Sequence, residues 1–149
     1  SAKDFPMSAT QKTFKAVLTA MSIMAVSISF AQTPVEVILT EGVVTSKELQ
    51  GPIKPTKVTS TFSAAGTNNN VHAIFKFKPF GKSVGLRAVV TQDTPDGRFE
   101  QDRVLSVKST EFNVTTSYAI REAGKYCLTV VDEFDEQTKY SGSACFTVR

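Results

Sequence analysis

The sequence predicts an all-β protein in which about seven antiparallel strands form a β-sandwich. Two observations support this fold class. Short runs rich in β-branched and aromatic residues recur from residue 35 onward, and several alternate apolar with polar side chains. Clusters of Gly, Pro, Asn and Asp separate these runs, and no segment among them has helical periodicity, so helices are not interleaved with the strands. A small barrel is the competing arrangement.

The expected strands can be placed from these runs and from the turns between them. They cover residues 35–40, 71–78, 84–91, 99–108 and 112–120, followed by the two arms of a C-terminal hairpin. A further short strand is expected within residues 58–62. The polar stretch 42–61 contains Gly51-Pro52 and Pro55 and is expected to be a loop or an edge excursion.

Alternation in two of these strands predicts which side chains face the core. The inward side chains of residues 71–78 are Val71, Ala73, Phe75 and Phe77, and the outward ones are His72, Lys76 and Lys78. The side chains that share one face in residues 112–120 are Phe112, Val114, Thr116, Tyr118 and Ile120.

Residues 124–149 predict a β-hairpin closed by a disulfide. Two β-patterned runs flank an acidic turn, and a turn centred in it places Cys127 opposite Cys145. The same register pairs Tyr126 with Phe146 on the opposite, apolar face. No other cysteine is present, and such a pair in an exported domain is expected to be bonded. Closing a loop of about 18 residues predicts about 3 kcal/mol of stabilisation.

The N-terminal part of the chain has the features of a secretory signal peptide. Two lysines precede an uncharged apolar run over residues 16–31, which is short for a bilayer span of about 20 residues. Small residues at Ser29 and Ala31 predict cleavage before Gln32. The expected location is therefore secreted, periplasmic or extracellular. Only the signal segment is expected to contact the membrane.

This leader divides the chain into two parts. Residues 1–31 comprise upstream residues and the apolar, helical signal segment, and residues 32–149 form the β-domain. The alternative is that the N-terminal helix is retained and serves assembly. The net charge of +3 is concentrated in the leader, so the β-domain is nearly neutral and has no bulk electrostatic reason to bind nucleic acid.

The composition gives little support to an enzyme or a metalloprotein. The chain has one histidine and no tryptophan, and the two cysteines are expected to be paired. His72 has no Ser/Asp or Cys arrangement that the sequence can attach to it, and a zinc site lacks ligands. We therefore expect a protein without catalytic residues, cofactor or bound metal.

One short segment resembles a feature of immunoglobulin-like domains. Glu122-Ala123-Gly124-Lys125-Tyr126 is similar to the segment that leads into strand F of that family, where the tyrosine makes the tyrosine corner. The family places a cysteine two residues after the tyrosine, where this chain has Leu128, and a tryptophan that this chain lacks. The resemblance is therefore to exported immunoglobulin-like modules of bacteria and archaea, and it implies binding, adhesion or structural roles.

Two groups of residues are candidates for partner contact. The first is the acidic hairpin turn, where Phe134 stands next to Asp135 and Glu136; a solvated turn is favoured there over a weak Ca²⁺ site, because the spacing is not that of an EF-hand. The second is Lys76 with Lys78, part of a basic bias that includes other residues able to share one face. Those other residues are Lys82, Arg87, Arg98 and Arg103.

The sequence thus favours an exported, non-enzymatic module that contacts a protein or glycan at the cell envelope. The alternative is a structural subunit of an extracellular assembly or filament, a homo-oligomer that uses its N-terminal segment for polymerisation.

Overall fold

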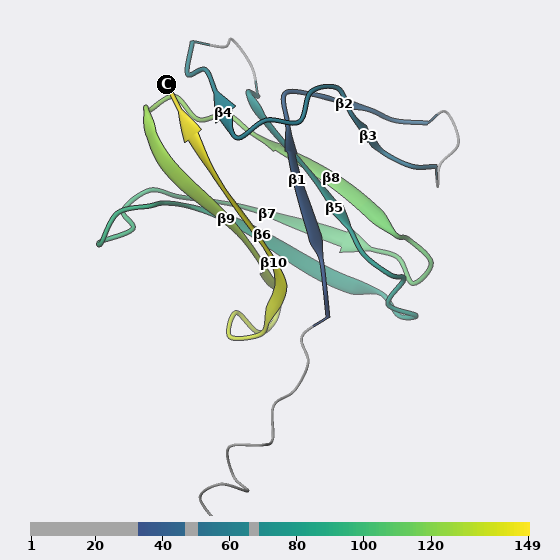
Figure 1. The fold of residues 1–149 in the computed structure, drawn as a ribbon. Coiled ribbons are helices and arrows are strands. Elements are labelled where there is room, and N and C mark those ends of the chain that lie inside the picture. The colour runs from purple at the N-terminus through teal and green to yellow at the C-terminus, as the bar shows by residue number, and fades with distance from the viewer. Residues whose placement is uncertain (1–32, 47–50, 66–68) are drawn as a thin grey trace, which may run out of the picture. The chain divides into compact units, whose positions relative to one another are not determined.

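The computed structural model describes residues 33–46, 51–65 and 69–149, and over these ranges the chain is all-β (Figure 1). They belong to one unit, Gln32–Arg149. The expected leader, with its signal-peptide cleavage site and its helix, lies outside the described residues.

The described residues form ten strands, of which seven have five residues or more. The longer strands are β1 (Glu36–Thr40), β5 (Val71–Lys76), β6 (Val84–Gln92), β7 (Glu100–Val107), β8 (Asn113–Tyr118), β9 (Gly124–Asp132) and β10 (Lys139–Val148). The two-residue strands are β2 (Val43–Val44), β3 (Lys54–Pro55) and β4 (Thr61–Phe62). The all-β prediction is confirmed, and the excursion expected in residues 42–61 contains the small β2–β3 sheet.

Two larger sheets share one hydrophobic core. The first has the order β1-β5-β8 and the second β4-β10-β9-β6-β7. Apolar side chains from both sheets, such as Phe75 and Tyr118 from the first and Leu86, Leu128 and Phe146 from the second, are buried together. β1 lies near β10 and β8 lies near β7, so the edges of the two sheets coincide on each side of the core.

The expectation that all strands pair antiparallel is wrong at one edge. β4 pairs parallel with β10, through Thr61 opposite Thr147, and Pro34 makes a parallel bridge to Ser141. The chain approaches this edge of β10 twice from the same direction, once before β1 and once after β3. Between these two segments the chain forms β1 of the other sheet and then the β2–β3 excursion (Figure 1).

Alternation correctly predicts the inward residues of β5, but it misplaces two other side chains. Ile74 has the outward parity and is nevertheless fully buried. The excursion crosses that face: the amide N–H of Ile53 donates to Asn113 Oδ1 on β8, and that of Lys57 donates to Thr40 Oγ1 on β1. Phe112 has the same parity as the buried Tyr118 and Ile120 but is 39% exposed, because β8 begins only after it.

Candidate functional site

The C-terminal hairpin has the register expected from the sequence where residues 124–129 pair with residues 143–148; nearer the turn the register shifts, and Val131 pairs with Lys139. Cys127 pairs with Cys145, Tyr126 with Phe146, and the two sulfur atoms are bonded. Tyr126 and Phe146 face the core, so the disulfide lies on the outer face of the five-stranded sheet. The hairpin is therefore cross-linked on its outer face and packs against the core on its inner face.

Tyr126 fixes the beginning of β9 through both its hydroxyl and its ring. The hydroxyl donates a 2.7 Å hydrogen bond to the carbonyl oxygen of Glu122, four residues upstream. The ring stacks on Phe146 with centroids 5.7 Å apart and meets the edge of Phe99 at 5.3 Å. Burial, followed by the charge of Glu122, raises the pKa of Tyr126, so the hydroxyl remains a donor.

The acidic turn between β9 and β10 is ordered by its own carboxylates. Asp132 Oδ1 accepts hydrogen bonds from the amides of Phe134 and Asp135, at 2.9 and 3.2 Å. Asp135 in turn accepts from the Thr138 hydroxyl at 2.7 Å and from the Gln137 amide at 3.1 Å. These bonds, the one from Thr138 first, lower the pKa of Asp135. The acidic sequence is thus used to build the turn.

Contacts with β6 hold the same turn against the outer face of the sheet. Glu136 forms an ion pair with Arg87, whose Nε also donates to Asp102 Oδ2 at 2.8 Å. The amide of Glu133 donates to the carbonyl oxygen of Gly85 at 3.0 Å. A Cβ at Gly85 would lie 2.9 Å from the Cβ of Glu133. A residue larger than glycine at position 85 would therefore clash with the turn.

Phe134 points away from the protein although the turn around it is fixed. Its side chain is 88% exposed, the largest value among the exposed large hydrophobic residues that the structure describes. Other aromatic side chains at this end of the domain pack together: Phe80 stacks on Phe77 at 4.9 Å and contacts Tyr140 at 6.0 Å. Phe134 is therefore not part of the hydrophobic core.

Tyr140 links the turn to this aromatic group. Its hydroxyl donates to Asp132 Oδ2 at 3.1 Å. Burial, and then the hydrogen bond to Asp132, raises the pKa of Tyr140 to about 12. Both oxygens of the Asp132 carboxylate are therefore engaged within the protein.

The basic residues do not form one face. Lys76 ends β5 and Lys78 follows it, whereas Arg87 and Arg103 lie on β6 and β7 of the other sheet. Arg98 forms an ion pair with Asp96 in the β6–β7 turn. Arg103 places its guanidinium 5.2 Å from the centre of the Tyr118 ring. The arginines are engaged in local contacts, and the suggested basic surface is not assembled.

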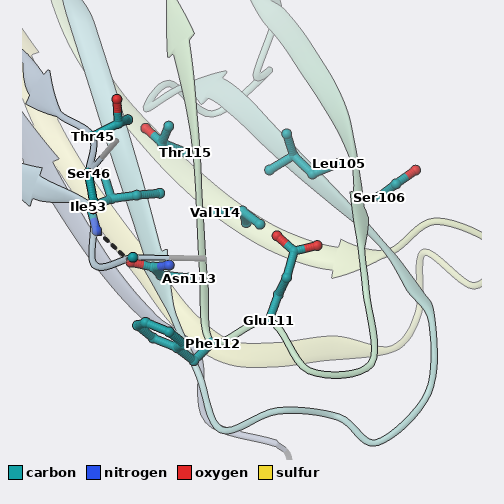
Figure 2. Close-up of a pocket in the computed structure, with 11 residues that line it drawn as sticks. Thr45, Ser46, Ile53, Leu105, Ser106, Glu111, Phe112, Asn113, Val114 and Thr115 are labelled. Carbon is teal, nitrogen blue, oxygen red and sulfur yellow. Dashed lines mark hydrogen bonds between the residues drawn. The ribbon is translucent and has the colours of Figure 1, made fainter. Parts of the chain in front are cut away.

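A groove that the sequence did not reveal lies beside β8. It has a volume of about 470 Å³ and is partly open to solvent. Figure 2 shows the residues that line it. Its walls come from the excursion before β3, from β7 and from the start of β8. The lining residues are Thr45, Ser46, Gly51, Ile53, Leu105, Ser106, Glu111, Phe112, Asn113, Val114 and Thr115. Only the order of strands in the sheets brings these segments together.

Two motifs from the sequence can now be placed. His72 lies on the outward parity of β5 beside Thr40 and Ser117. Asn113, the first residue of the Asn113-Val114-Thr115 glycosylation sequon, is only 7% exposed and is bonded to the Ile53 amide, so the folded domain does not present this side chain to solvent.

Within residues 33–46, 51–65 and 69–149 we find no group of three or more His, Cys, Asp or Glu side chains placed to hold a metal ion. No helix among these residues is long and apolar enough to cross a membrane. Comparison with models of known protein families gives no match for the chain, and neither does comparison with curated proteins.

Proposed function

We propose that this chain is an exported, non-enzymatic β-sandwich module of the immunoglobulin-like type. In this proposal it binds a protein or glycan partner at the cell envelope through the turn Asp132–Thr138. The observation that supports it most directly is an aromatic side chain, Phe134, held 88% exposed on a turn that hydrogen bonds and an ion pair fix in place.

The immunoglobulin-like assignment has two supports besides the sequence resemblance. Strand order β4-β10-β9-β6-β7 opposite β1-β5-β8 fits a sandwich in which β9 has the place of strand F and β10 that of strand G. The hydrogen bond from Tyr126 to the Glu122 carbonyl has the form of a tyrosine corner. The disulfide fits an oxidising compartment, in agreement with the expected export.

A fixed turn with an exposed ring is suited to recognition. Ordering a loop on binding reduces affinity, and this turn is already ordered by Asp132, Asp135 and Arg87. Aromatic side chains that enter a pocket on a partner provide a large share of binding energy at many interfaces. Asp135 and Glu136 are exposed next to Phe134, so the proposed partner has an apolar pocket with a cationic rim.

The test is capture of envelope components by the immobilised full-length chain. We expect species that bind the wild type to be lost with Phe134→Ala and retained with Val104→Ala, a control that removes another exposed apolar side chain, 53% exposed on β7. Equal capture by both variants would show that the turn is not the contact surface.

A second variant separates the ring from the ordering of the turn. Arg87→Met removes the partner of Glu136 and leaves Phe134 in place, so we expect weaker capture of the same species. Arg98→Met, which removes an ion pair in a different turn, should leave capture unchanged.

The second candidate function is a structural subunit of an extracellular assembly. It is favoured by the edge of β8, which has no neighbouring strand in the described part of the chain. Mass spectrometry of the native protein distinguishes the two. A chain that starts at Gln32 supports the module, whereas an intact apolar segment together with filaments in electron micrographs supports the subunit.

A further inference from the structure

The outer edge of β8 offers main-chain hydrogen-bonding groups without a strand to receive them. β8 pairs with β5 on one side only. The amide of Phe77 donates to the Phe112 carbonyl, and because bonding alternates along antiparallel strands, residues 114 and 116 also bond toward β5. The N–H and C=O groups of Asn113, Thr115 and Ser117 therefore point to the open side.

This edge lacks the devices that usually prevent strand pairing. Its sequence, Asn-Val-Thr-Thr-Ser-Tyr, has no charge and no proline and is rich in residues that favour strands. The facing edge strand β7 differs, because Arg103 lies on its inward parity, opposite the buried Ala88, and Glu100 and Asp102 lie on the other side. Among the described edge strands of five residues or more, β8 is the one that carries no charged residue.

The groove beside β8 is recessed, and its shape selects the kind of partner. Figure 2 shows Thr45 and Ile53 on one side of β8 and Leu105 and Ser106 on the other. Walls on both sides of β8 favour a single extended segment over the edge of a second folded sheet. A single extended segment fits between them, and its length would follow the six residues of β8.

The lining predicts the side chains of such a segment. Leu105 and Val114 line the groove toward the core and favour apolar side chains, whereas Thr45 provides a hydroxyl group on the other side. The Thr115 hydroxyl donates to the Ala73 carbonyl oxygen at 2.8 Å. Glu111 is the charged residue of the lining, and its carboxylate, which accepts from the Lys108 amide at 2.8 Å, is directed into the groove (Figure 2).

We propose that the β8 edge binds an extended segment of another polypeptide by strand addition. The segment alternates small apolar and polar side chains and has a lysine or arginine that meets Glu111. Main-chain pairing with Asn113, Thr115 and Ser117 provides affinity, and the alternating side chains provide selectivity. This site does not use Phe134, so it is independent of the turn proposed above as a contact surface.

The test uses the full-length chain and a fluorescein-labelled nine-residue peptide of alternating valine and threonine with one lysine near its centre. Binding followed by fluorescence anisotropy is expected at micromolar to submillimolar concentration. Thr115→Pro removes an N–H on the open side and should weaken binding at least about tenfold, whereas Val104→Ala, on β7 and outside the groove lining, should remain within about threefold of wild type. Far-UV circular dichroism establishes that both variants fold.

Two further comparisons keep the test decisive if Thr115→Pro fails to fold. Two peptides are methylated at alternate backbone nitrogens. The peptide whose methylated nitrogens face β8 should not bind, and the peptide whose methylated nitrogens face away from β8 should bind like the unmethylated one. Glu111→Gln should weaken the lysine peptide about three- to tenfold and leave a glutamine version of the peptide unchanged. Phe134→Ala should bind the peptide like the wild type, which separates this site from the turn.

Three results would overturn the proposal. One is the absence of an anisotropy change at about 1 mM protein. Another is equal loss of binding for both methylated peptides. The third is self-association of the chain that Thr115→Pro abolishes, which would make a second copy the occupant.

Discussion

The backbone of Val35 passes directly over Gly142, and a Cβ at residue 142 would lie 1.8 Å from the Val35 carbonyl oxygen. The Val35 amide donates to Ser141 at 3.1 Å, and the Ser141 amide donates to Thr33 at 3.2 Å. The absence of a side chain at Gly142 is therefore what lets the first described residues lie along β10 before the chain crosses to the other sheet.

Gly142→Ala is expected to destabilise the domain by about 1–3 kcal/mol, the usual cost of forcing additional atoms into a packed site. Urea unfolding followed by circular dichroism measures the free energy of unfolding. The control is Gly42→Ala, whose Cβ would meet only the Thr56 hydroxyl at 3.0 Å, a side chain able to move. Equal stability of the two variants would contradict the close approach of Val35.

Opening the Cys127–Cys145 bond is expected to lower the free energy of unfolding by about 3 kcal/mol, because the bond restricts an 18-residue loop in the unfolded chain. The measurement is urea unfolding with and without a reducing agent. A Cys127→Ala/Cys145→Ala double variant should match the reduced protein and be insensitive to the reductant. If the reductant shifts the double variant as well, the effect is not due to this bond.

Tyr126→Phe is expected to cost about 1–2 kcal/mol, because it leaves the Glu122 carbonyl without the buried hydroxyl that donates to it. Tyr140→Phe is the matched control. Its side chain is half-buried, whereas that of Tyr126 is fully buried, so we expect a loss below about 1 kcal/mol. Thermal or urea unfolding ranks the two variants, and the reverse order would show that the Tyr126 hydrogen bond is not important for stability.

Phe134→Ala is expected to leave stability within about 0.5 kcal/mol of wild type, since its ring is 88% exposed. Phe146→Ala removes a ring that is 3% exposed and packed between Phe62 and Tyr126, and it should cost about 3–5 kcal/mol. Unfolding curves of the two variants test the assignment of one phenylalanine to the surface and the other to the core. A large loss for Phe134→Ala would mean that its ring packs against the domain.

The Asp135 carboxylate should stay ionised, and keep its hydrogen bonds, at pH values where ordinary aspartates become protonated. Hydrogen bonds from Thr138 and Gln137 hold the pKa of Asp135 below its ordinary value of 3.8. A pKa lowered by folding gives a contribution to stability that is complete above the ordinary value and is lost as the pH falls through the lowered one. An NMR titration of the Asp135 carboxyl and the Gln137 amide measures it, and a midpoint at or above 3.8 would contradict these bonds.

The closing hairpin was predictable because its information is local. Period-two alternation and an acidic turn define the register, and that register places Cys127 opposite Cys145. The same local pattern gave the inward face of β5. It misjudged Ile74, because the residues that cover Ile74 belong to an excursion with no periodicity of its own.

In the candidate sites too, local sequence pattern predicts some features, and contacts between distant segments decide the others. Composition and pattern pointed to Phe134 and the turn around it, but the contact with Arg87 that fixes this turn depends on the pairing of β6 with β9. The groove beside β8 was not predictable, since no motif marks a strand that lacks a neighbour. It arises from sheet order, which brings Thr45, Ser46, Gly51 and Ile53 together with residues 105–106 and 111–115.

The sequence by itself determined the fold class, the hairpin and its disulfide, because these depend on alternation and spacing within a few tens of residues. Only the tertiary structure decided which edges remain open, where β4 and the segment before β1 run parallel to β10, and which polar side chains find partners. The physical reason is that pairing and burial between distant segments are set by the packing of two sheets around one core, and no local pattern encodes that packing.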